Sequence, residues 1–88
     1  MSEPHIAVNA GIRPLDTVVP GCAVELADFG AELDAAFREQ LLAYGLHPGQ
    51  RLEVLQQLPM TVILCDHVEL ALEAPVARMI GVRLPAGS

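Results

Sequence analysis

One stretch of this chain, residues 31–44, has the spacing of apolar side chains that makes an amphipathic helix. Leu33, Phe37 and Leu41 recur at steps of four residues, and acidic and polar residues take the other side. Gly45 follows as a residue able to adopt positive φ, and Leu46 can fold back onto the helix end. The sequence therefore predicts one amphipathic helix of about three turns, with a defined stop.

Short runs that alternate between apolar and polar residues predict strands in the rest of the chain. Two of them follow Pro-Gly pairs, Pro20-Gly21 and Pro48-Gly49, which fit the centre of a tight turn. The pair Asp66-His67 lies between two further runs and predicts a hairpin. Five short strands favour a small, mainly β barrel over a βαβ sheet, which needs more crossover helices. The predicted strands cover residues 22–27, 51–58, 61–65, 68–72 and 80–84, and a short helical turn covers residues 73–79.

The apolar positions of these elements define the expected core. Aromatic residues make up only 3% of the chain, so Val, Leu and Ile must fill most of its interior. Residues 1–13 have no clear period and predict a flexible arm, and residues 85–88 predict a tail. The predicted core comprises Val24, Leu26, Leu33, Phe37, Leu41, Leu46, Leu52, Val54, Val62, Leu64, Val68, Leu70, Leu72, Ile80 and Val82.

Charge and composition exclude several classes of protein. The net charge is −6, and the five basic residues form no stripe that could bind nucleic acid or an anionic membrane surface. Apolar residues make up 52% of the chain, which argues against disorder. No run of about 18 apolar residues is present, so we expect no membrane span. The N-terminus lacks the features of a secretory signal, and the two cysteines form no disulfide framework, so we expect a cytoplasmic protein with reduced thiols.

Catalytic motifs are absent from the sequence. It contains no Gly-rich phosphate loop and no His and carboxylate pair in a motif context, so we expect neither an enzyme nor a bound cofactor. The candidate metal ligands are Cys22, Cys65, His67 and His47. On one continuous strand Cys65 and His67 would share a face, but their spacing is not diagnostic of a metal site. The favoured interpretation is that the cysteines are small apolar residues and the histidines turn residues.

Apolar residues at surface positions suggest a binding patch. Leu55 and Ile63 fall on outward positions of their predicted strands, as Leu42 does on the helix. Tyr44, Leu46 and His47 lie at the helix end and its adjoining turn, and form a second candidate contact. The alternatives are a dimer seam, or a barrel core that is reached from both faces of a strand.

The run from Leu41 to Gly49, followed by the strand Leu52 to Leu55, resembles the FeoA family. The hallmark of that family is a helix that ends in Leu-x-x-x-Gly-Leu-x-Pro-Gly, followed by a strand of apolar-x-apolar pattern. The alternating run Val68 to Leu72, the turn Ala74 to Ile80 and the stretch Leu15 to Leu26 also look like the family. The resemblance covers about 70 residues and implies an FeoA-like, SH3-like β-barrel domain over residues 14–84.

The resemblance also implies a function. FeoA-like proteins are small cytoplasmic proteins that take part in bacterial ferrous iron uptake, and they are thought to assist FeoB, a membrane transporter with a GTPase domain. The same fold occurs as the C-terminal domain of DtxR-type repressors, but this chain lacks the DNA-binding helices of such a repressor. We therefore expect a non-enzymatic adaptor that binds an FeoB-type transporter on its cytoplasmic side and can self-associate. The alternatives are a metal-binding or metal-responsive protein, or an SH3-like interaction domain with another partner.

Overall fold

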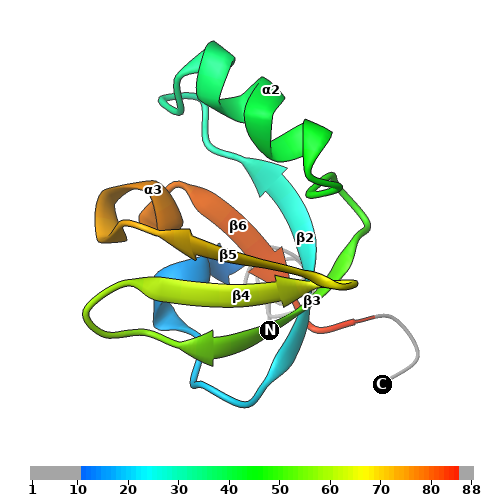
Figure 1. Cartoon of the computed structure of the whole chain (residues 1–88), viewed down its shortest axis with the longest axis vertical. Helices are drawn as coiled ribbons and strands as arrows, with labels where there is room; N and C mark the ends of the chain where they lie inside the picture. The colour runs from blue at the N-terminus through cyan, green and yellow to red at the C-terminus, as the bar shows by residue number, and fades with distance from the viewer. Residues whose placement is uncertain (1–10, 86–88) are drawn as a thin grey trace, which may run out of the picture.

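Six antiparallel strands form a single sheet in the computed structural model, which describes residues 11–85 (Figure 1). The strand order is β1-β6-β2-β3-β4-β5, so β1 and β5 are the edges of a sheet that is not closed. The mainly β fold expected from the sequence is confirmed. The elements are β1 (Arg13–Pro14), the 3-10 helix η1 (Leu15–Thr17), β2 (Ala23–Phe29), α2 (Ala35–Ala43), β3 (Arg51–Gln56), β4 (Thr61–Cys65), β5 (Val68–Leu72), α3 (Ala74–Arg78) and β6 (Ile80–Arg83).

The sixth strand, β1, is one that the sequence analysis missed. It is only two residues long, and it pairs Arg13 with Val82 and Pro14 with Gly81 on β6. A strand this short has too few residues to show an alternating pattern. Most of the expected arm (residues 1–13) and tail (residues 85–88) lies outside the described residues, so their flexibility stays a prediction.

Helix α2 begins four residues later than its apolar spacing suggested, because Asp34 caps it. The Asp34 carboxylate accepts a hydrogen bond of 3.2 Å from the backbone N–H of Phe37, which leaves the preceding residues outside the helix. The other end closes as expected. Gly45 has φ +93°, its N–H donates to the Leu42 carbonyl at 3.0 Å, and the N–H of Leu46 donates to the Leu41 carbonyl at 3.0 Å. These two bonds make a Schellman motif.

The phase of β4 was predicted wrongly. Ile63, Thr61 and Cys65 face the core, whereas Val62 and Leu64 are only half-buried. Residues directly opposite each other in an antiparallel pair share a face, and Ile63 lies opposite Leu70. The inward direction of β5 therefore fixes the inward direction of β4. All five residues of β4 suit a strand interior, so its own pattern did not show which face is buried.

Three other expected positions also differ from the structure. Val68 was expected in the core, but it lies beside the hairpin turn and is 37% exposed. Leu58 and Leu84 were expected to be the last residues of their strands, but β3 ends at Gln56 and β6 ends at Arg83. Both leucines are exposed. Phe37 and Leu70 are partly buried and pack against the core.

A partly buried polar bridge ties the segment before β2 to the β3–β4 loop. The Gln57 side-chain amide donates to the carbonyls of Leu15 at 3.0 Å and Val18 at 2.7 Å. Its carbonyl accepts a hydrogen bond of 2.6 Å from the hydroxyl of Thr61, the one buried polar residue among residues 11–85. Leu15 and Val18, which the predicted core omitted, are held in the interior by this bridge.

Candidate functional site

The expected helix-end contact is only partly a surface. Tyr44 is 52% exposed, and Leu42 and His47 are also exposed. Leu46 is fully buried, because the Schellman motif turns its side chain under the helix end beside Leu41. Its predicted position in the core is therefore confirmed, and its second assignment, to the helix-end contact, is wrong. We call Leu42, Tyr44 and His47 the helix-end patch.

The expected strand patch is also reduced to one residue. Leu55 on β3 is 39% exposed, as the sequence analysis predicted for an outward position. Ile63 is fully buried, because its partner in the register is the inward-facing Leu70. Placing Ile63 at a contact surface was wrong, and only Leu55 stays available to a partner.

The candidate metal ligands are dispersed in the structure. Cys22 is exposed, Cys65 is buried, and β4 ends at Cys65, so that His67 lies in the hairpin turn and not on the same strand face. Nδ1 of His47 lies 3.1 Å from the Pro48 carbonyl oxygen. Within residues 11–85, no three His, Cys, Asp or Glu side chains are grouped so that they could hold one metal ion.

The two thiols differ in their surroundings. Burial raises the pKa of the Cys65 thiol, the negative charge of Asp66 raises it further, and a side-chain hydrogen bond with Gln50 opposes them. The Cys65 Sγ atom lies 3.7 Å from the Gly45 carbonyl oxygen. Cys65 is therefore a protonated core residue, whereas Cys22 opens onto a groove.

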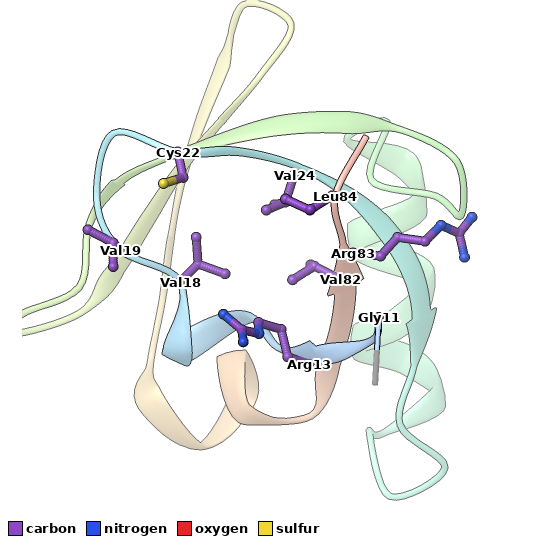
Figure 2. A pocket seen from close by; sticks show the side chains of 9 residues that line it. All are labelled: Gly11, Arg13, Val18, Val19, Cys22, Val24, Val82, Arg83 and Leu84. Carbon is purple, nitrogen blue, oxygen red and sulfur yellow. The ribbon is translucent and has the colours of Figure 1, made fainter. Parts of the chain in front are cut away.

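That groove, which we call the β2–β6 groove, has a volume of about 450 Å³ and an apolar interior (Figure 2). Figure 2 shows Val18 and Val82 pointing toward each other across it, with Arg83 directed outward. The Arg83 guanidinium donates a 2.9 Å hydrogen bond to the Glu25 carboxylate on the neighbouring strand. The groove is lined by Gly11, Arg13, Val18, Val19, Cys22, Val24, Val82, Arg83 and Leu84.

A second groove, which we call the acidic groove, has a volume of about 590 Å³ and lies between the start of α2, the end of β5 and α3. Its apolar lining includes Met60 and Met79. Three carboxylate side chains, those of Glu32, Asp34 and Glu73, also line it. These elements are far apart in the sequence, so no local pattern could have revealed either groove. The acidic groove is lined by Glu32, Leu33, Asp34, Phe37, Met60, Ala71, Leu72, Glu73, Val76 and Met79.

The described residues thus form two concave surfaces with largely apolar linings, the second of which also carries three carboxylates. None of the helices between residues 11 and 85 is long and apolar enough to cross a bilayer.

The fold belongs to the SH3-like class found in solved FeoA structures. The chain is 27% identical to the FeoA protein from Chlorobium tepidum, with a TM-score of 0.75, and the match covers 85% of this chain and 72% of that one. It is 25% identical to an iron uptake regulatory protein (FeoA), with a TM-score of 0.70, over 82% of this chain and 95% of that one. The fold also matches T. acidophilum IdeR at 15% identity and a TM-score of 0.74, over 83% of this chain but only 34% of IdeR.

The FeoA domain model matches residues 13–84, and the chain therefore belongs to the FeoA domain family. No curated protein sequence matches it. Membership of the family implies a role in ferrous iron transport or its regulation. FeoA-domain proteins are not known as enzymes.

Proposed function

We propose that this chain is a non-enzymatic adaptor that binds the cytoplasmic part of an FeoB-type ferrous iron transporter and modulates it. The observation that carries the proposal is the family match, which spans residues 13–84 and so takes in nearly the whole domain. One solved FeoA structure is matched over 95% of its own length, which supports carrying the role of that family over to this domain.

The surface of the molecule supports a protein partner. The helix-end patch combines the exposed Leu42 and Tyr44, and Leu55 adds an apolar residue on β3. Tyr side chains are enriched in protein interfaces because they bury a large apolar area and also carry a hydroxyl. We assign first contact with the transporter to the helix-end patch and Leu55.

The test is co-purification from bacteria grown without iron. The tagged chain is mixed with detergent-solubilised membranes of its own source, and the bound membrane proteins are identified by mass spectrometry. The proposal expects an FeoB-type transporter to be recovered, and expects the recovery to fall with Tyr44→Asp but not with Leu58→Asp, a substitution at an exposed leucine of the β3–β4 loop. Absence of the transporter from the eluate, with a folded chain on the resin, contradicts it.

A further inference from the structure

Strand β5 has an open edge in the part of the chain that the structure describes. It pairs only with β4, in the register Cys65 to Val68, Ile63 to Leu70 and Thr61 to Leu72. Across a two-residue turn the flanking residues form a hydrogen-bonded pair, and such pairs alternate along an antiparallel ladder.

It follows that Glu69 and Ala71 direct their backbone N–H and C=O groups away from β4. No backbone partner for either residue occurs among residues 11–85. Both residues are exposed. An exposed row of this kind is a template on which another strand can pair.

The acidic groove lies along the same edge. Ala71 and Leu72 both line it, although adjacent residues of a strand point to opposite faces. The groove therefore reaches the edge of β5 itself. Its other wall comes from Leu33 and Phe37 at the start of α2, and Figure 1 shows α2 standing away from the sheet.

The groove carries negative charge, which favours a basic partner. Glu32, Asp34 and Glu73 line the groove, and no Arg or His does so. Two arginines lie nearby: the Arg38 guanidinium donates at 3.3 Å to the carbonyl of Leu33 beside the groove, and Arg78 lies 3.6 Å from the Asp16 carboxylate outside it. One arginine beside three carboxylates leaves the groove acidic. A second copy of this chain would bring the same carboxylates together, which is unfavourable.

We propose that a basic, extended segment of a partner protein binds here, adding as a strand to the free edge of β5 and placing alternate apolar side chains in the acidic groove. Backbone hydrogen bonds to Glu69 and Ala71 supply the pairing, and the carboxylates select lysine or arginine on the segment. This inference deepens the adaptor role proposed above and rests on it, because it states what kind of segment the transporter would present.

The test uses a short capped peptide of alternating lysine and valine as the probe, with the glutamate and valine version as its control. Binding is measured by fluorescence anisotropy at low ionic strength. We expect the basic peptide to bind at least about tenfold more tightly than the acidic one, and its affinity to fall as salt is added. Equal binding of the two peptides contradicts the charge selection.

Hydrogen exchange distinguishes a strand at the edge from other ways of occupying the groove. The backbone amides of Glu69 and Ala71 are open in the free chain and should exchange at least about tenfold more slowly when the basic peptide is bound. Peptide binding without that protection overturns strand addition. Protection that appears with rising protein concentration alone identifies a second copy as the occupant, and also overturns the proposal.

Three substitutions complete the test. Ala71→Pro removes an N–H that β4 does not use, so the folded variant, checked by circular dichroism, should lose most of its peptide affinity. Glu73→Gln should weaken binding several-fold, whereas Glu53→Gln on β3, which changes the net charge equally, should not. If both glutamine variants bind as the unaltered chain does, the acidic groove is not the site.

The outcome for the peptide is separable from the outcome for the transporter. A chain that recovers the transporter equally well with Ala71→Pro retains the adaptor role and loses this inference. A chain that binds the peptide as described but recovers no transporter retains the open-edge site and loses the adaptor role.

Discussion

The Thr61 hydroxyl donates a 2.6 Å hydrogen bond to the side-chain carbonyl of Gln57, and the amide of the same Gln57 holds the carbonyls of Leu15 and Val18. One side chain thus joins the segment before β2 to the loop between β3 and β4. A buried donor or acceptor left without its partner is costly.

Removal of this bridge should destabilise the fold. Gln57→Ala removes the side-chain partner of the Thr61 hydroxyl and of the Val18 carbonyl, while the Leu15 carbonyl keeps the backbone N–H of Val18. The variant should lower the free energy of unfolding by about 2 kcal/mol. Gln56→Ala, at the exposed neighbouring residue, should change it by less than about 0.5 kcal/mol. Urea denaturation followed by circular dichroism measures both. Similar losses in the two variants would mean that the bridge has no special role.

The turn after α2 should depend on glycine. Gly45 has φ +93° and no atom within 4 Å of the place where a Cβ would stand, so the cost of substitution is in the backbone alone. Gly45→Ala should lower the free energy of unfolding by about 1 kcal/mol, and Gly45→Asn by less, since Asn tolerates positive φ better. An alanine variant as stable as the original chain would rule out this account of the helix stop.

The burial of Ile63 gives a direct test of the phase of β4. Ile63→Ala should cost about 3 kcal/mol because it empties a fully buried position. Leu64→Ala, on the half-buried face, removes the same number of carbon atoms and should lower the free energy of unfolding clearly less. Thermal or urea unfolding of the two variants shows which face of β4 is buried. The reverse order would restore the phase that the sequence analysis assigned.

The two cysteines should differ in reactivity, because only the thiolate reacts and Cys65 is both buried and raised in pKa. At neutral pH iodoacetamide should modify Cys22 at least about tenfold faster than Cys65, as read by mass spectrometry of the intact and digested chain. Cys22→Ser should remove the fast reaction. Fast modification that persists in this variant would place Cys65 at the surface.

The raised pKa of Cys65 also predicts how stability changes with pH. The unfolded chain releases the Cys65 proton near the ordinary thiol value of 9.0, while the folded chain keeps it. This contribution is therefore complete below pH 9.0 and is lost as pH rises through the higher pKa of the folded state. Above pH 9.0 the free energy of unfolding of Cys65→Ala should therefore fall less with rising pH than that of the unaltered chain. An identical pH profile for the two proteins would contradict the assignment.

Most of the element order could be predicted from the sequence, because the signals are local. The helix stop at Gly45 and the hairpin turn at Asp66-His67 depend on residue types within a few positions of each other. Strands β4 and β5 have the predicted bounds for the same reason. The two-residue strand β1 and the Gln57 bridge were missed because they depend on contacts between distant segments.

The surface could be predicted less well than the fold. The hairpin turn and the inward Leu70 together imply an inward Ile63, whereas the pattern of β4 alone does not show its buried face. Leu46 was expected both in the core and at the helix-end contact, and its burial confirms the core position and removes it from the contact. The acidic groove needed the three-dimensional meeting of α2, β5 and α3.

The helix-end patch and Leu55 make a testable interface. Tyr44→Asp and Leu55→Asp each place a charge where an apolar contact is proposed, and each should weaken transporter binding at least about tenfold. Both side chains are partly exposed already, so the fold should survive, with Leu58→Asp as the matched control. If both variants bind like the control, contact lies elsewhere on the molecule.

The most direct test of the adaptor role is a titration of purified FeoB-type transporter, in detergent or nanodiscs, with this chain labelled at Cys22. We expect saturable binding that competes with unlabelled chain and weakens with Tyr44→Asp. A folded chain that shows no saturable binding to its own transporter, either with or without guanine nucleotide, would rule out the adaptor role.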